Sequence, residues 1–345
     1  MGNGGKSRLK VLGILSVCLT ILLGTPAPVV HADSNLASQV SSYLRSQSGQ
    51  YSVTAIELGG QQREIHIRDS TQVDPASIFK LYYAALAFEK IQQGKWTFRT
   101  KLSSKYSVQT CLRLMISYSD NECAVDIRGK LGIQHINSRI NQWGLSSSHI
   151  VANSRGEYLT KHTTTADVAR FLKQLFAGNA LDAGNTANFI TLLKGQVWRG
   201  RISSGIQAGV PVASKSGQLL VNNGMIEADS AIIYGPTSTY LLVVIGSGGA
   251  KSLAVRGVSK LVYENWQAPI SKRASYSKSQ LVIREKTYLR TRPGGPVIKT
   301  LSVGAAIELE WSQRGWLYVQ SGTRKGFIYE NTVRLSNGYL RWGEL

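Results

Sequence analysis

Ser77 and Lys80 stand three residues apart, just before the long apolar run Leu81–Phe88. Pro75 fits the beginning of a helix, and the alanines and leucines that follow favour helix over strand. On a helix this spacing places the hydroxyl and the amine on one face. A lysine can activate a serine when its pKa is lowered, and burial and a helix N-terminus both lower it. The pair predicts a nucleophilic serine at the start of a buried helix, although an ordinary core helix has the same pattern.

Two further polar stretches supply the other groups that serine acyl transfer needs. Ser119-Asp120-Asn121 follows about forty residues later at a predicted helix break, and Lys215-Ser216-Gly217 lies on a predicted strand. The second serine can relay a proton, and the second lysine can neutralise a substrate carboxylate. The glycine lets a substrate backbone approach the strand edge. Taken singly, the first stretch is also a good helix cap and the second a common strand end.

An oxyanion that forms during acyl transfer needs backbone donors. Those of Ser77 and Gln218 are expected, because one lies at a helix start and the other on the strand edge.

Strand patterns occur at both ends of residues 33–268, with helical patterns between them. Residues 51–58 and 64–68 predict a hairpin, and turn signals divide a later meander. The meander strands are expected at residues 210–220, 225–234 and 240–245. Helices are expected near residues 35–46, 77–93, 107–145, 163–176, 186–194 and 253–266. This order predicts an α+β domain in which an antiparallel sheet, built from both terminal segments, packs with helices.

A second, smaller unit is expected after a polar linker at residues 269–280. Residues 281–335 contain five short strand patterns separated by turns, at 288–294, 297–301, 306–311, 315–319 and 325–328. So few residues bury enough apolar surface only as a small closed all-β barrel.

In the order and spacing of its three polar motifs, the chain resembles the class A β-lactamases and related penicillin-recognising serine hydrolases over about residues 35–266. The resemblance implies a β-lactamase/transpeptidase-like fold. It makes Ser77 the acylated nucleophile, Lys80 its base or proton shuttle, and Ser119 the relay to the leaving nitrogen. It also implies that Asn121 holds the substrate amide and that Lys215 and Ser216 bind its carboxylate.

One departure concerns removal of the acyl group. Class A enzymes use a glutamate on a long loop before the threonine-capped helix, whereas the loop at residues 151–162 is short and Glu157 is its one acid. Glu157 is therefore the candidate base for deacylation, acting through a water, with a solvated loop acid as the alternative.

The tail resembles the bacterial Src-homology-3-like (SH3-like) domains that accompany cell-wall enzymes. The resemblance rests on residues 288–294, 315–319 and 326–328. It implies a module that binds peptidoglycan, with a groove formed by Trp311, Trp316 and Tyr318. Alternatively, these aromatic side chains fill the small barrel.

The N-terminus predicts export. Basic residues precede the apolar stretch Val11–Leu23, and Val30-His31-Ala32 fits a cleavage site, so residues 1–32 are expected to be a signal peptide. An uncleaved membrane anchor is the alternative. Cys111 and Cys123 remain after cleavage, and an even pair in an exported protein predicts a disulfide.

The formal net charge of +20 favours anionic partners such as cell-wall polymers, although it also fits a solubilising surface. The basic residues are spread along the chain without a nucleic-acid-binding motif, so no nucleic acid is expected as a partner. The histidines lack metal-ligand spacing and no phosphate-binding glycine loop is present, so neither metal nor cofactor is expected.

The leading hypothesis is an exported, cell-wall-associated serine hydrolase that forms an acyl-enzyme with a β-lactam. The first alternative is a D,D-peptidase or transpeptidase acting on D-alanyl stem peptides and only inhibited by β-lactams. The second is a non-catalytic wall-binding protein with a degenerate hydrolase domain.

Overall fold

The computed structural model describes residues 1–2, 31–59, 61–102, 106–267, 280–283, 286–292, 295–313, 316–329 and 332–335. Almost all of the expected signal peptide and linker lies outside these residues. Within the described ranges, no helix is both long enough and apolar enough to span a membrane.

A six-stranded sheet joins the two ends of the first domain, in the order β1-β3-β2-β8-β7-β6. Its strands are β1 (His31–Ala32), β2 (Gln50–Glu57), β3 (Arg63–Ile67), β6 (Val212–Val221), β7 (Gly224–Tyr234) and β8 (Thr239–Ser247). The pairs β2–β3, β2–β8, β7–β8 and β6–β7 are antiparallel, and β1 is parallel to β3. The β2–β8 pairing confirms that the early hairpin and the late meander share one sheet.

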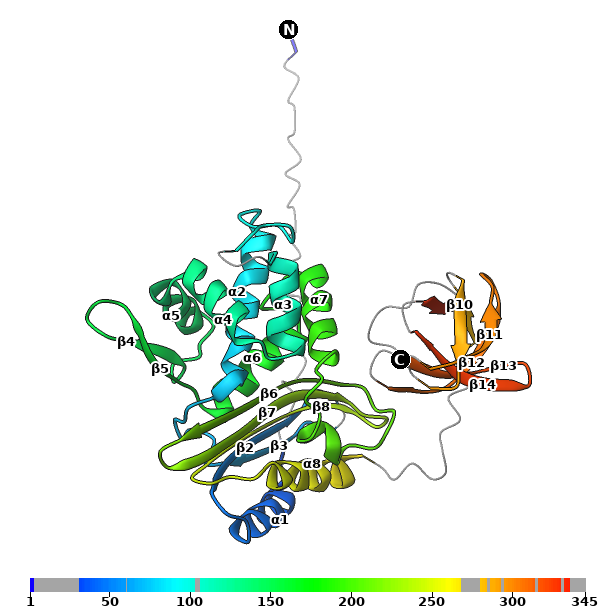
Figure 1. The fold of residues 1–345 in the computed structure, drawn as a ribbon. Coiled ribbons are helices and arrows are strands. Elements are labelled where there is room, and N and C mark those ends of the chain that lie inside the picture. Colours follow the sequence, from blue (N-terminus) through cyan, green and yellow to red (C-terminus); the bar gives the residue numbers. More distant parts are fainter. Residues whose placement is uncertain are drawn as a thin grey trace.

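Helices cover both faces of this sheet (Figure 1). On one side lie α1 (Ser34–Arg45) and α8 (Ser252–Trp266). On the other lie α2 (Lys80–Gln92), α3 (Val108–Ser117), α4 (Asn121–Leu131), α5 (Ile133–Gln142), α6 (Thr165–Phe176) and α7 (Ala183–Lys194). The expected α+β architecture is confirmed.

Helix α2 is the centre of the larger hydrophobic core. Its first nine residues, Lys80–Phe88, are all buried, as expected for a helix that is apolar nearly all round. The Thr164 side chain caps α6 by accepting from Asp167 N.

A disulfide joins Cys111 on α3 to Cys123 on α4, with 5.0 Å between the Cα atoms. The predicted pairing is confirmed. The bond closes a loop that contains Ser119-Asp120-Asn121, and so limits how far this motif moves relative to α3.

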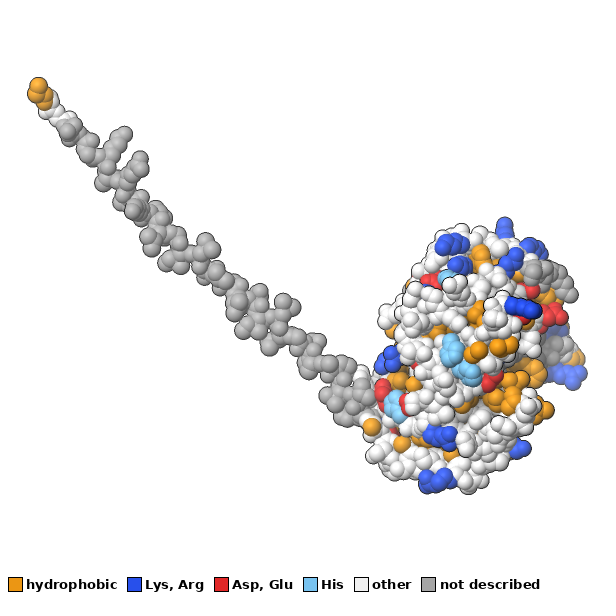
Figure 2. Space-filling model, turned by 90° about the vertical axis from the view of Figure 1, so that its left-hand side faces the viewer, with side chains coloured by type: hydrophobic (Ala, Val, Ile, Leu, Met, Phe, Trp, Pro, Cys, Tyr) orange, Lys and Arg blue, Asp and Glu red, His pale blue; other side chains and the backbone are white. Residues whose placement is uncertain are grey.

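A two-stranded hairpin replaces the polar loop expected before α6. Strands β4 (His149–Ala152) and β5 (Tyr158–His162) pair with a register shift at Val151/Ala152. Because the two strands are short and none of their residues except Ile150 is buried, the sequence carries little strand signal here. Figure 2 shows the side on which this hairpin lies in Figure 1, with basic side chains scattered rather than gathered in one patch.

The C-terminal unit is one seven-stranded sheet, in the order β11-β10-β14-β13-β12-β9-β15. Its strands are β9 (Gln280–Ile283), β10 (Thr287–Arg290), β11 (Val297–Leu301), β12 (Ala306–Gln313), β13 (Trp316–Ser321), β14 (Arg324–Tyr329) and β15 (Val333–Leu335). The all-β class is confirmed. The expected count of five strands is corrected by β9 and β15, and β11 and β15 are the edges of the sheet among the described strands.

The predicted aromatic groove in this unit falls mostly outside the description. The side chains of Trp311 and Trp316 are not among the described residues. Tyr318 packs against Phe327 with ring centroids 4.9 Å apart.

Candidate active site

Ser77 lies in a short 3₁₀ turn, η1 (Ala76–Phe79), directly before α2. Asp74 Oδ1 accepts the Ala76 N–H at 2.7 Å, and Ala76 has a φ of +47°, a conformation that costs energy for a residue with a Cβ. The expected α-helix therefore begins one turn later than the serine. The hydrogen bond to Asp74 stabilises this uncommon conformation of Ala76, and Ser77 follows directly in the turn.

Gly217 on the edge strand β6 lies against this turn. A Cβ atom at Gly217 would stand 2.8 Å from the backbone N of Ser77 and 3.1 Å from that of Ile78. A side chain at this position would collide with backbone, so only glycine fits. The glycine was expected to admit a substrate, and the structure shows that it first admits the Ser77 turn.

Lys80 is 6 % exposed, and its amine contacts the second motif. Nζ donates to the carbonyl oxygen of Ser119 at 2.7 Å and to Asn121 Oδ1 at 2.6 Å. The expected contact with the Ser77 hydroxyl is not among the hydrogen bonds of the described residues. Lys80 reaches instead across to the α3–α4 junction, which sequence spacing along one helix does not reveal.

These contacts are compatible with an uncharged amine as well as with an ammonium. Burial, with a smaller effect from Lys161, lowers the pKa of Lys80 to about 8, while Asp120 acts in the opposite direction. A neutral amine has two N–H groups, which the two oxygen acceptors use, and one lone pair. That lone pair is available to take a proton from a hydroxyl.

Ser119 is presented by an uncommon backbone conformation with a φ of +65°. Asp120, the next residue, caps α4 by accepting the Cys123 N–H at 2.8 Å. Ser119 Oγ accepts from Lys215 Nζ at 3.0 Å. The residue therefore contacts Lys80 through its carbonyl oxygen and Lys215 through its hydroxyl, and it joins all three motifs.

Lys215 is fully buried on β6, and Nζ also donates to the Ser216 carbonyl oxygen at 2.7 Å. Burial lowers the pKa of Lys215 to about 7, and repulsion from Lys80 contributes to this lowering, while Asp229 opposes it. The uncharged and charged forms are then similar in abundance near neutral pH. Lys215 can accordingly exchange a proton with Ser119.

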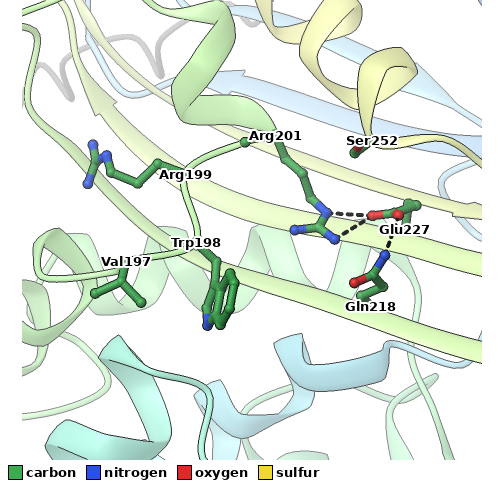
Figure 3. Close-up of a pocket in the computed structure, with 8 residues that line it drawn as sticks. Val197, Trp198, Arg199, Arg201, Gln218, Glu227 and Ser252 are labelled. Carbon is green, nitrogen blue, oxygen red and sulfur yellow. Dashed lines mark hydrogen bonds and ion pairs between the residues drawn. The ribbon is translucent and has the colours of Figure 1, made fainter.

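Gln218 follows the third motif but turns its side chain away from it. Nε2 donates to Glu227 Oε1 at 2.9 Å, and Glu227 accepts from Arg201 Nε at 2.6 Å (Figure 3). These residues form part of a cavity of about 540 Å³ next to the site. Its lining includes Val197, Trp198, Arg199, Gly200 and Ser252 as well. The backbone role expected of Gln218 stays a prediction.

The cavity is joined to the Ser119 loop through Trp198, whose Nε1 donates to the Tyr118 carbonyl oxygen at 3.0 Å. The Trp198 side chain is largely exposed. Sequence reasoning missed Trp198, Arg201 and Glu227, because nothing in their spacing links them to the three motifs.

Glu157 is not brought to this cluster. It is exposed on the turn between β4 and β5, where Oε2 accepts from Asn153 Nδ2 at 2.7 Å. The described residues show no contact between Glu157 and Ser77, Lys80 or Ser119. This position fits the solvated loop acid, and the deacylating role stays a prediction without a supporting contact.

The described residues contain no group of three or more histidine, cysteine, aspartate or glutamate side chains placed to hold a metal ion. What they do contain is a serine on a constrained turn, two lysines with lowered pKa values and a bridging serine. Together these groups can accept, relay and return a proton, which is the requirement for nucleophilic acyl transfer.

The chain belongs to the beta-lactamase enzyme family, because that family's sequence profile matches residues 35–266. No match was found among curated proteins.

Solved structures show the same fold at low identity. PBP-A is 19 % identical, with 69 % of this chain and 98 % of that chain covered at a TM-score of 0.63. An ancestral (GNCA) class A β-lactamase is 20 % identical, with 67 % and 99 % covered at 0.60. A β-lactamase from Xanthomonas campestris is 18 % identical, with 68 % and 98 % covered at 0.60. The predicted β-lactamase/transpeptidase-like fold is confirmed.

Proposed function

We propose that the chain is a serine hydrolase of the class A type that β-lactams acylate at Ser77. The observation that carries this proposal is the continuous set of contacts from Lys80 through Ser119 to Lys215. Burying two lysines costs free energy, because each charged form loses its hydration. A non-catalytic protein gains nothing from that cost, so the contacts argue against a degenerate domain.

Acylation begins when the neutral amine of Lys80 accepts the Ser77 proton while Oγ forms a bond to the lactam carbonyl carbon. The carbon–nitrogen bond of the ring then breaks, and the ring nitrogen takes a proton that Ser119 relays. The ring opens without loss of a fragment, so the adduct contains all the atoms of the antibiotic.

Similarity to a trapped complex supports the substrate class. One matching structure is described as an acyl-enzyme complex of a PBP-A mutant with penicillin G, at a TM-score of 0.63. For this chain, a β-lactam is accordingly the first substrate to test.

A second candidate function is a D,D-peptidase or transpeptidase on D-alanyl stem peptides. It is favoured by the position of Glu157, whose carboxylate is exposed and bonded to Asn153 rather than placed over Ser77. An acyl group without a base to activate water is removed slowly. The peptidase function thus predicts that the β-lactam adduct is long-lived and that the substrate turned over is a peptide. Export, a location at the cell wall and peptidoglycan binding by an SH3-like C-terminal unit belong to this proposal as well.

Intact mass spectrometry after incubation with penicillin G tests the proposal. We expect an increase equal to the whole antibiotic, and none in the Ser77→Ala variant. A parallel assay with a chromogenic cephalosporin measures turnover. An adduct that persists supports the peptidase, rapid turnover supports a β-lactamase, and absence of both refutes acylation.

A further inference from the structure

Lys161 on β5 is a cation that lies beside Asp74, just before the Ser77 turn. The backbone of Val73 pairs with that of Thr163 in both directions, at 2.9 and 3.0 Å, so the segment before η1 lies beside the end of β5. Lys161 Nζ lies 3.6 Å from Asp74 Oδ1. The same oxygen accepts the Ala76 N–H. One carboxylate therefore joins Lys161 to the residue that precedes the nucleophile.

The position of this charge is fixed by more than one contact. The side chains of Lys161 and Asp74 are 16 % and 19 % exposed. Lys161 Nζ also donates to the Tyr158 hydroxyl at 3.3 Å, and the Arg128 guanidinium lies 4.3 Å from the centre of the Tyr158 ring. A charge held at this depth is screened by salt less than a charge on the open surface.

The charged groups around Lys80 come from four elements. Asp120 lies at the start of α4, Lys161 on β5, Lys215 on β6, and Asp74 beside η1. Asp120 favours the charged form of Lys80, and Lys161 disfavours it. Lys80 in turn lowers the pKa of Lys215 by repulsion.

The two lysines differ in the groups that lie beside them. Lys161 has a carboxylate beside it, whereas Lys80 donates to the neutral oxygens of Ser119 and Asn121. A carboxylate stabilises a neighbouring ammonium far more than a neutral oxygen does. Repulsion from Lys161 therefore favours the uncharged form of Lys80.

We propose that Lys161, held in place by Asp74, is a positioning residue that increases the fraction of Lys80 in the uncharged form able to accept the Ser77 proton. The inference rests on the proposed acylation of Ser77 and adds a residue outside the three motifs. It also gives the hairpin a role in acylation that does not involve Glu157.

The test measures the rate of acylation of the full chain by a fluorescent penicillin from pH 5.5 to 10. For Lys161→Met, we expect the inflection of the rate to move up by about 0.5–1 pH unit, as removal of one partly screened charge predicts. The rate at pH 7 falls by about three- to tenfold, while the plateau at high pH stays within about twofold. Lys161→Arg, which keeps the charge, should restore the wild-type profile.

Asp74→Asn supplies a second, opposite prediction. The amide oxygen still accepts from Ala76, but the compensating negative charge is lost, so the inflection should move to lower pH. If Lys161→Met and Asp74→Asn both leave the inflection unmoved, or if the Lys161→Met rate falls equally at every pH, the inference is wrong. If the wild type is not labelled at any pH, acylation of Ser77 itself fails.

Discussion

The two sides of Ser77 differ in how they are built. On the side of α4 and β6, the buried lysines Lys80 and Lys215 both donate to Ser119, at 2.7 and 3.0 Å. On the side of the β4–β5 hairpin, Glu157 is exposed and accepts a hydrogen bond from Asn153 in the same turn. The charged side chain that pairs with another element on this side is Lys161, which lies beside Asp74. The comparison indicates that the buried polar groups, Lys80 and Lys215, serve the formation of the acyl-enzyme. The fold provides no comparable arrangement of described residues for removing the acyl group.

Replacement of Lys80 is the most direct test of the side formed by α4 and β6, which we call the buried side. We expect Lys80→Met to lower the acylation rate by about 10³-fold, because general base catalysis contributes about 10²–10⁴-fold. The measurement is the rate of labelling by a fluorescent penicillin at pH 8. A melting curve checks that the variant folds. Retention of the wild-type rate would show that another group takes the Ser77 proton.

The two buried lysines on this side, Lys80 and Lys215, should also make the stability of the folded chain depend on pH. The pKa values of Lys80 and Lys215 are lowered to about 8 and about 7 in the folded chain, so between these values and pH 10.5 the unfolded chain binds more protons. The free energy of unfolding should therefore rise with pH in this window. Above this window it should fall, because burial raises the pKa of Tyr82 and keeps its proton on only in the folded state.

We expect the melting temperature at pH 9.5 to exceed that at pH 7 by at least about 5 °C. One pKa unit corresponds to about 1.4 kcal/mol, and one kcal/mol to about 2–4 °C in a domain of this size. In Lys215→Met the rise should be smaller, which separates this effect from the general loss of positive charge. An unchanged rise would contradict the lowered pKa of Lys215.

Contact between the Ser77 turn and β6 gives a somewhat smaller expected effect. Gly217→Ala places a Cβ 2.8 Å from Ser77 N, so the turn has to move. We expect acylation to slow by about 10–10²-fold, as small displacements of reacting groups do. Gly129→Ala on α4 is the matched control, because its Cβ meets no atom within 4 Å. Equal rates in both variants would mean that the turn tolerates the displacement.

Much of the buried side could be predicted from sequence, because its residues lie in three short motifs and on strongly patterned elements. Lys80, Ser119 and Lys215 were identified by type and order alone. The partner of the Lys80 amine was not, since it depends on how α2 packs against the α3–α4 junction. Contacts between distant segments leave no local pattern.

The hairpin side was harder for the same physical reason. Asp74, which stands two residues before the Ala76 N–H that it accepts, has the local signature of a turn cap. Lys161 has no such signature, because its place next to Asp74 arises from the pairing of Val73 with Thr163. Sequence reasoning selected Glu157 because a carboxylate can act as a catalytic base. The backbone pairing instead brings the basic residue Lys161 to the segment beside the site.

Replacement of Glu157 should have the smallest effect and is the sharpest test of the comparison. In Glu157→Gln we expect both formation and loss of the penicillin adduct to stay within about twofold of wild type, because a base acts only within hydrogen-bond reach, directly or through one water. The measurement is the decay of the adduct by intact mass over time. A decay slowed by about 10²-fold or more would show that the hairpin closes over the acyl-enzyme. The two sides of Ser77 would then be equally catalytic.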